Sequence, residues 1–470
     1  MNYKLRIIHI VYVTFLLLGL SFLGYFYSDI KIAGFIGFGL FCLVLGVWRR
    51  EYALYLAFLE LCLGSFGYLL SFDAGGLHLS LRMLFFVIIM GLWLADLLRK
   101  KIHPNFSFQK ERTSPFLKGG PGGIFIFLAL FMLIWLFAIL QGYLRGNGLS
   151  NIFFDANSYL YLLLLLPALA YINTEEKLKD LKKIILTGAS VLAFGTIAIF
   201  ITFTYCKSPN FLGILYKWLR DFRIAEITPL QGGSYRIFLQ SQIFLIVGMI
   251  ILAERYFFGR IKFWKYSLLT ILFSASIYIS LSRSLWIGLM IGFVVFLLLA
   301  KILEKKKILK KSITLILSIL IGVLLVGLFA KGNIIDERLK IGESASNTRI
   351  EQLVPLLPAI YKNPVFGYGF GKTLTFFSRD PRINGEYTTY AFEWGYLDMI
   401  LKFGVLGLAI YLGFIFIILR DLFINKNIAC LALIVSLLAI HMFTPYLNHP
   451  LGIGILLLTF LLRYDITGRE

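Results

Sequence analysis

The chain has 470 residues, of which 59% are hydrophobic and only 15% are charged, and its mean hydropathy is +0.83. Soluble domains carry about 25% charged residues, so this composition excludes an ordinary soluble fold and indicates a multi-pass membrane protein. The formal net charge of +21 does not indicate nucleic-acid binding, because the basic residues cluster in short segments between apolar runs.

Apolar runs long enough to cross the hydrocarbon core recur along the whole chain. They predict an all-α, polytopic transmembrane helical bundle of about fourteen spans with one large extracytoplasmic loop. The first run follows a short basic lead and has no Ala-x-Ala site, so we interpret it as an uncleaved span. The predicted spans are 7–27, 31–48, 52–71, 80–98, 122–142, 158–173, 184–204, 235–254, 266–281, 285–301, 313–330, 396–419, 428–444 and 449–463.

The basic clusters fix one orientation for these spans. With Met1 in the cytoplasm, every basic cluster between spans also falls in the cytoplasm, as the positive-inside rule requires. Both termini are then cytoplasmic, and the segment 331–395 is extracytoplasmic. The Gly/Pro-rich segment 105–123 would be cytoplasmic, as either a flexible insertion or a regulatory loop. The clusters are Arg49-Arg50, Arg99–Lys101 with Arg112, Lys177–Lys183, Arg255–Lys265, Lys301–Lys311 and Arg420.

We expect two parts in the chain: N-terminal transmembrane helices over 1–235, and a catalytic region over 236–470 that includes the long outer loop 331–395. Loops of this length are uncommon and usually functional, so chemistry is expected there. The four cysteines show neither metal-ligand spacing nor a disulfide framework, and no metal site is predicted.

Three residues near the outer face are candidates for chemistry. Arg283, in the corner Ser282-Arg283-Ser284, suits phosphate recognition by its planar guanidinium, or else anchors the span at the interface. Arg349 begins an amphipathic helix with apolar residues at 350, 353, 354 and 357. It is either a second phosphate ligand or the partner of Glu351 on a solvated face. Glu393, among aromatic residues at a span entrance, is either a general base or a helix-start acid.

Other polar residues are weaker candidates. Arg236 and Arg82 lie near the outer ends of their spans, where each either lines a pocket or anchors the helix. Glu60 is expected away from the outer face, while Asp398 and Lys402, four residues apart, are expected to pair. Histidines without an obvious carboxylate partner are expected to be structural: His78, His441 and His449.

In their order and spacing, these motifs resemble those of the bacterial O-antigen ligase and polymerase family. The corner at Arg283 is similar to the family's serine–arginine motif. The segment 349–351 and the loop Asn363–Gly371 are similar to its arginine and its asparagine-proline, aromatic, glycine-x-glycine loop. The stretch Glu393–Gly407 is similar to its His-Asn-x-Tyr-Leu … Gly-x-x-Gly stretch. Glu393 stands where ligases carry the histidine regarded as the base, which favours the polymerase branch or a different acceptor.

The resemblance implies a GT-C-like membrane glycosyltransferase in the bacterial inner membrane that is metal-independent, inverting and free of cofactors. It would polymerise or transfer an undecaprenyl-pyrophosphate-linked oligosaccharide at the periplasmic face, onto a glycan or lipid-linked acceptor. Glu393, Arg283 and Arg349 would be catalytic. The expected partners are membrane lipids and a polysaccharide chain-length regulator or flippase. The residues expected to bind pyrophosphate or glycan are Arg283, Arg349, Arg236, Arg82 and Tyr396.

The alternative from another class is a flippase or another transporter of lipid-linked oligosaccharides. A transporter would be expected to carry charged residues deeper in its spans and to consist of two related halves. Neither feature is evident in the sequence. The sugar, its linkage and the choice between polymerase and ligase are not encoded in any motif that we recognise.

Overall fold

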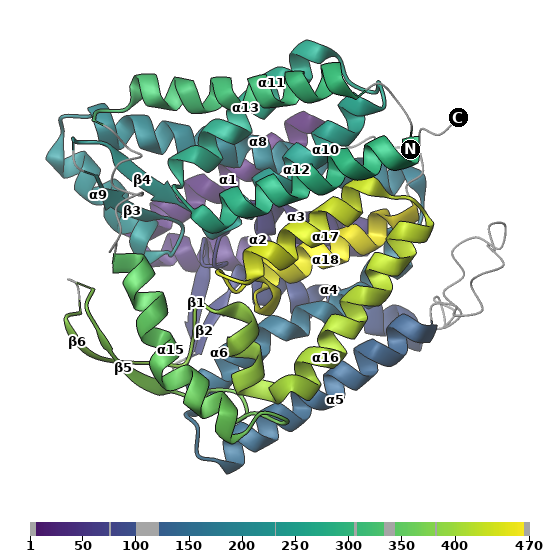
Figure 1. The fold of residues 1–470 in the computed structure, drawn as a ribbon, viewed down its shortest axis with the longest axis vertical. Helices are drawn as coiled ribbons and strands as arrows, with labels where there is room; N and C mark the ends of the chain where they lie inside the picture. Colours follow the sequence, from purple (N-terminus) through teal and green to yellow (C-terminus); the bar gives the residue numbers. More distant parts are fainter. Residues whose placement is uncertain are drawn as a thin grey trace. The chain divides into compact units, whose positions relative to one another are not determined.

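The computed structural model describes residues 6–74, 77–99, 122–230, 232–304, 308–332, 344–380 and 383–464. These residues form helices and three two-stranded antiparallel sheets (Figure 1). Contacts along the chain divide it into two compact units. Unit 1 comprises 1–105, 164–337 and 464–470, and unit 2 comprises 106–163 and 338–463. The Gly/Pro-rich segment 105–123 lies almost entirely outside the described residues.

Unit 1 contains the N-terminal helices and those that follow residue 164. The hairpin β1–β2 pairs Ser71 with Ser80, and β3–β4 pairs Glu226 with Phe238. Its elements are α1 (Ile7–Phe26), α2 (Ser28–Trp48), α3 (Arg50–Leu63), β1 (Ser71–Ala74), β2 (Leu77–Ser80), α4 (Leu81–Leu98), α7 (Leu165–Tyr171), α8 (Glu175–Tyr205), α9 (Pro209–Asp221), β3 (Glu226–Pro229), β4 (Tyr235–Phe238), η2 (Gln240–Gln242), α10 (Ile243–Phe257), α11 (Phe263–Ile279), α12 (Arg283–Glu304) and α13 (Leu309–Phe329).

Unit 2 joins two helices from the first third of the chain to the C-terminal helices. In Figure 1, α16 runs beside α5, as their extensive contacts also indicate. Short 3-10 turns η1 (Tyr161–Leu164) and η4 (Leu462–Tyr464) lie where the chain passes between units. The elements of unit 2 are α5 (Gly122–Leu144), α6 (Leu149–Leu160), α15 (Ser344–Lys362), β5 (Leu374–Ser378), β6 (Gly385–Thr389), α16 (Gly395–Ile424), α17 (Ile428–His441), η3 (Tyr446–Asn448) and α18 (Pro450–Leu461).

The prediction of a helical, multi-pass membrane protein is confirmed. Ten helical segments in the described part of the chain are at least 18 residues long and apolar enough to cross a membrane. The other four predicted spans correspond to shorter helices, α3, α11, α17 and α18, of 14, 17, 14 and 12 residues. Helix length alone therefore leaves the exact number of spans open between these two counts.

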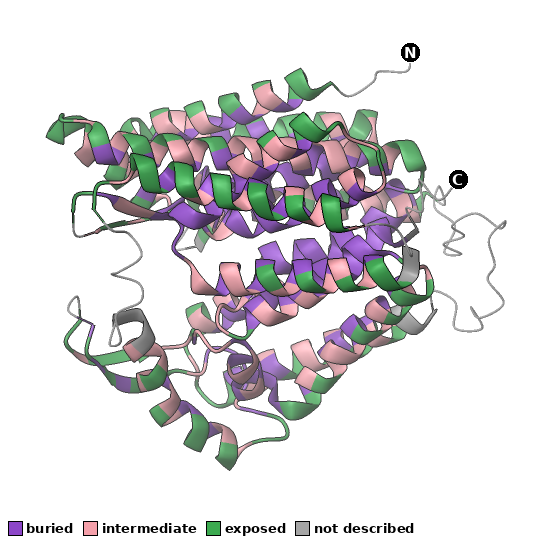
Figure 2. Ribbon diagram, turned by 45° about the horizontal axis from the view of Figure 1, so that its top comes forward, coloured by how far each residue is buried: buried purple, intermediate pink, exposed green. Residues whose placement is uncertain are grey.

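The helices differ in how much of their surface other helices cover. Figure 2 shows some that are buried along most of their length and others with continuous exposed faces. The first kind includes α10 and α18, whose residues are almost all buried. The second kind includes α13, where Ile316, Leu320 and Leu324 are exposed. Large apolar side chains on an exposed helix face suit contact with lipid, because lipid tails are as apolar as these side chains and no protein packing is needed to cover them.

Short polar side chains mark where several helices begin. The Ser80 hydroxyl accepts a hydrogen bond from the Met83 amide at the start of α4, and Thr174 does the same for Lys177 at α8. Asn427 accepts from Cys430 at the start of α17. Each side chain satisfies one amide that lacks an intrahelical partner, which is why these residue types favour the position.

Candidate functional site in unit 2

Glu393 and Arg349 form an ion pair in unit 2. The Arg349 Nε atom lies 2.6 Å from Glu393 Oε2, and the two side chains are 24% and 39% exposed. Arg349 lies on α15, and Glu393 precedes the first residue of α16 by two positions. The pair therefore joins the outer-loop helix to the entrance of the following span. The sequence predicted both residues as candidates but not that they contact each other.

Two further hydrogen bonds hold the pair in place. The Glu393 amide donates to the buried Gln352 side-chain oxygen at 2.9 Å, and Trp394 Nε1 donates to the Arg349 carbonyl at 2.8 Å. Beneath them lies a small apolar core that includes Leu356 and Phe392. These two bonds hold the backbone at Glu393 and the backbone at Arg349 in fixed positions relative to each other. The carboxylate and the guanidinium are therefore oriented in advance, as a preorganised site requires. Gln352 was not singled out from the sequence.

Part of each charged group remains available. Within the part of the chain that the structure describes, neither terminal nitrogen of Arg349 nor Glu393 Oε1 has a hydrogen-bond partner. A guanidinium with two free terminal nitrogens can bind a phosphate in a bidentate manner. A carboxylate with one free oxygen can accept a proton from a hydroxyl group. The arrangement thus provides an anion ligand and a base side by side.

The helix that carries Arg349 begins earlier than predicted. It begins at Ser344, so Arg349 lies in the second turn rather than the first. It continues through Pro355 to Lys362. Glu351 does not pair with Arg349; its carboxylate oxygens accept from the Arg379 amide at 3.2 Å.

The apolar stripe predicted on α15 points away from the protein core. Ile350, Val354 and Leu357 are exposed, whereas Leu356 and Ala359 on another face are buried. The burial of Leu356 and Ala359 against Phe392 explains how the helix is fixed to unit 2. An exposed apolar stripe of this kind suits contact with a membrane surface.

A glycine-rich loop packs against a break in α16. Gly404 has φ +69°, and a Cβ atom there would collide with the Val365 carbonyl, so only glycine fits. The break frees backbone groups of α16, and the loop Asn363–Gly371 satisfies them. The Tyr368 and Gly369 amides donate to the carbonyls of residues 401 and 402 at 2.8 and 2.9 Å, and the amide of residue 405 donates to Pro364. Because the loop and the helix pair with each other, these backbone groups do not remain unpaired in the interior.

The end of α5 holds the other side of this loop. Gln141 Nε2 donates to the Gly367 carbonyl at 3.3 Å, and Asn147 Nδ2 donates to the Phe370 carbonyl at 2.8 Å. A Cβ atom on Gly142 would overlap the Phe370 backbone, and a Cβ atom on Gly369 would overlap the Gly142 backbone. The loop is therefore clamped between α5 and α16, and neither contact has a local signal in the sequence.

A buried charged network lies close to the loop. Lys402 Nζ lies 2.6 Å from Asp155 Oδ1 and 2.9 Å from the Asp398 carboxylate, and all three side chains are at most 6% exposed. Asp155 also accepts from the Gly371 amide, and Asp398 accepts from the Phe392 amide and Asn448. The predicted Asp398–Lys402 pair is confirmed. Asp155 was missed, although a charged residue beside an apolar run is itself a signal of a special site.

In unit 1, Arg283 is the first residue of α12 and is half-buried. The corner before it turns at Leu281, which has φ +48°, and the Ser282 and Ser284 hydroxyls lie 3.1 Å apart. Arg236, on β4, donates from Nε to the Ser280 carbonyl at 2.9 Å. The end of α11 and the start of α12 thus meet at the predicted corner. Arg236 contacts the backbone of this corner at Ser280.

Arg82 is buried in unit 1 and donates to Glu60 at 2.8 and 3.1 Å and to the Ser65 carbonyl at 3.0 Å. Glu60, which was expected away from the outer face, contacts Arg82 in the first turn of α4. The physical reason is that α3 ends at Leu63, which places Glu60 in its last turn. These contacts correspond to the anchoring alternative, and a binding role for Arg82 stays a prediction.

Tyr396 is engaged within unit 2, where its hydroxyl donates to the Leu438 carbonyl at 2.9 Å and its ring packs edge-on against His441. Two histidines have backbone partners that suit a structural role: His441 accepts from Leu447 and His449 from Leu451. For His78 the expected lack of a carboxylate is wrong, because the β1–β2 register places Asp73 directly opposite, in contact with its ring.

One stretch of the chain is similar to a known family. Residues 268–412, which include Arg283, Arg349 and Glu393, match the family model for O-antigen ligase. No curated protein matches the chain, and no solved structure matches it. The resemblance to the O-antigen ligase family is confirmed by the match. It points to a membrane enzyme of the O-antigen ligase or polymerase type, which acts on a lipid-linked glycan and an acceptor.

Proposed function

We propose that this protein is a membrane glycosyltransferase that moves an oligosaccharide from undecaprenyl pyrophosphate to a sugar hydroxyl, as an O-antigen or exopolysaccharide polymerase or ligase. The main support is the pairing of Arg349 with Glu393 inside the segment that matches the O-antigen ligase family. An anion ligand and a base held together are the two groups that such a transfer needs.

Arg349 binds the donor in this proposal. Its Nε atom already orients Glu393, and its two terminal nitrogens bind oxygens of the pyrophosphate as a fork. As the bond between the anomeric carbon and the pyrophosphate oxygen breaks, negative charge grows on the leaving group. The guanidinium stabilises that charge in the transition state, which is usually the largest catalytic contribution.

Glu393 acts as the general base. Its Oε1 atom takes the proton of the acceptor hydroxyl while the hydroxyl oxygen forms a bond to the anomeric carbon. The pyrophosphate leaves with the electron pair of the broken bond, so the products are an extended glycan, undecaprenyl pyrophosphate and a protonated Glu393. Attack opposite the leaving group inverts the anomeric centre. The arginines supply the positive charge, with no metal in the step.

The remaining predicted residues have supporting roles. Arg283 contributes to pyrophosphate binding, on the basis of its serine–arginine motif, and Arg236 supports the corner through the Ser280 carbonyl. Arg82, in unit 1, and Tyr396, in unit 2, are each proposed to contact the substrate with their protein contacts maintained. The reaction takes place at the periplasmic face of the inner membrane, with both termini in the cytoplasm.

The test is transfer by the purified protein in proteoliposomes with an undecaprenyl-pyrophosphate-linked oligosaccharide. We expect release of undecaprenyl pyrophosphate together with a longer or transferred glycan whose new linkage is inverted. Arg283→Ala and Arg349→Ala should each abolish transfer while membrane insertion is unchanged. Retention of configuration, or activity of the Arg349→Ala variant equal to that of the parent, would contradict the proposed mechanism. Movement of the intact lipid-linked glycan across the bilayer without transfer would indicate a flippase.

A further inference from the structure

Two cations share one aromatic ring in unit 2. The Arg145 guanidinium lies 4.9 Å from the centre of the Tyr368 ring, and Lys372 Nζ lies 5.1 Å from the same centre. Arg145 directly follows α5, and Lys372 directly follows the glycine-rich loop. The two positive charges therefore lie no more than about 10 Å apart, in cation–π contact with a common platform.

Among the residues that the structure describes, no carboxylate lies within 4 Å of Arg145 or Lys372. Two other cations of unit 2 are compensated: Arg349 by Glu393, and Lys402 by two aspartates. Arg145 and Lys372 thus bring to the Tyr368 ring two positive charges that have no carboxylate partner among the described residues. Two positive charges of this kind are the electrostatic requirement for binding a dianion.

The platform is held rigidly. The Tyr368 amide donates to the Leu401 carbonyl, and the Tyr368 carbonyl accepts from Asn147, two residues after Arg145. Hydrogen bonds therefore hold the segment that carries Arg145 close to the segment that carries Lys372. A ligand that bridges them would not have to order a flexible loop, so little binding energy is lost to conformational entropy.

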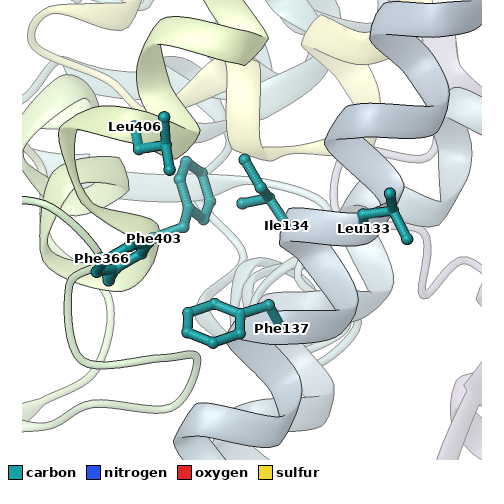
Figure 3. Close-up of a pocket in the computed structure, with 6 residues that line it drawn as sticks. All are labelled: Leu133, Ile134, Phe137, Phe366, Phe403 and Leu406. Carbon is teal, nitrogen blue, oxygen red and sulfur yellow. The ribbon is translucent and has the colours of Figure 1, made fainter.

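An apolar cavity of about 240 Å³ adjoins the same loop. In Figure 3, Ile134 and Phe137 of α5 point toward Phe366 of the loop and toward residues 403 and 406 of α16. The Phe137 and Phe366 rings are 5.7 Å apart. The lining is entirely hydrophobic: Leu133, Ile134, Phe137, Phe366, Phe403 and Leu406. This chemistry suits a hydrocarbon chain and not a sugar.

The cavity and Arg145 lie on one side of α5. Ile134, Phe137, Gln141 and Arg145 are three or four positions apart, so they share a helix face. The rise of an α-helix separates Phe137 from Arg145 by about 12 Å. A ligand with a hydrocarbon chain at one end and an anionic group at the other would span both features.

We propose that Arg145, Tyr368 and Lys372, together with this cavity, bind a polyprenyl pyrophosphate, with the pyrophosphate at the cations and the first isoprene units in the cavity. The charge balance selects this lipid, because a pyrophosphate carries at least two negative charges whereas the phosphodiester of a bilayer phospholipid carries one. The identification of the lipid as the carrier of the glycan rests on the proposed function. Neither Arg349 nor Glu393 is among the residues of this site.

Binding is measured without turnover, in nanodiscs of zwitterionic lipid, with undecaprenyl pyrophosphate as the probe. The Arg349→Ala background removes the other phosphate ligand of unit 2. In that background we expect Arg145→Gln and Lys372→Gln each to weaken binding about tenfold, the usual effect of losing one charge-assisted contact. Arg145→Lys should keep most of the affinity, since the charge remains. Lys362→Gln, at an exposed lysine at the end of α15, is the matched control and should bind like its parent.

A second variant tests the cavity. Ile134→Trp fills it, and should weaken undecaprenyl pyrophosphate binding while leaving inorganic pyrophosphate binding unchanged. Thermal unfolding verifies that each variant is folded. The proposal is overturned if the glutamine variants bind like the Lys362→Gln control. It is also overturned if phosphatidylglycerol binds as tightly with the same residue dependence, which would make the site an ordinary phospholipid site.

The two proposals fail separately. Residue-dependent lipid binding in a protein that transfers no glycan would refute the proposed function and retain this site. Full transfer activity with unchanged binding in the Arg145→Gln, Lys372→Gln double variant would refute the site and retain the function.

Discussion

Lys402 is the cation that balances the buried carboxylates of unit 2, and its removal is expected to destabilise the protein strongly. Its ammonium group lies between Asp155 and Asp398, and all three side chains are almost fully buried. Lys402→Met keeps the length of the side chain but leaves two adjacent carboxylates without a cation. Breaking a buried ion pair by removing one partner costs about 3–5 kcal/mol, so we expect a loss of stability of at least that size.

The assay is denaturant unfolding of the purified protein in a fixed detergent. A triple variant, Lys402→Met with Asp155→Asn and Asp398→Asn, is the matched control. It removes all three charges and should recover most of the stability, because a neutral network avoids the desolvation cost. The reasoning is refuted if Lys402→Met unfolds at the same denaturant concentration as the parent, or if the triple variant is less stable than the single one.

Three other predictions use different parts of the structure. Gly404→Ala forces a side chain into a left-handed conformation against the Val365 carbonyl. It should therefore cost about 1–3 kcal/mol or more and impair transfer. The control is Gly327→Ala, at a glycine with open space around it, which should neither lose stability nor impair transfer. Equal stability of the two variants would contradict this account. Arg349→Lys should retain little transfer activity, because a point charge cannot both orient Glu393 and bind phosphate as a fork; full activity would rule out bidentate binding. A reporter active only outside the cytoplasm should function when fused after Gly385 and fail after Lys301; the reverse would overturn the topology.

Local patterns predicted much of unit 2 correctly. Apolar periodicity predicted the helix around Arg349, and the i,i+4 spacing predicted the Asp398–Lys402 pair; the structure contains both. The apolar run after Gly395 gave α16, so that Glu393 was expected at the entrance to a span. Each of these features depends on residues within one or two turns of each other, where helix geometry alone determines the neighbours.

The contacts between elements were not predictable in the same way. Arg349 and Glu393 are 44 positions apart, and Lys402 and Asp155 are 247 positions apart. No periodicity specifies which distant segments approach, because that depends on packing of the whole unit. The early end of α3, which brought Glu60 to Arg82, was also missed, since apolar residues continue past Leu63 into the loop before β1.

The match to the O-antigen ligase family concerns the type of enzyme, whereas the identity of the base depends on this chain's own residue. Glu393 stands at the position where the resembling ligases carry histidine. A carboxylate oriented by a guanidinium can accept a proton, and Glu393→His should retain part of the activity, since imidazole is a base at neutral pH.

The central claim is that Glu393 is the general base, and the most direct measurement is the turnover number of purified Glu393→Gln with saturating lipid-linked donor. Glutamine keeps the shape and removes the basicity, so we expect a loss of about 10²–10⁴-fold, with donor binding unchanged because the arginines remain. Glu386→Gln, at an exposed glutamate on β6, is the control and should turn over like the parent. Parental turnover by Glu393→Gln would show that Glu393 is a structural residue at the start of α16.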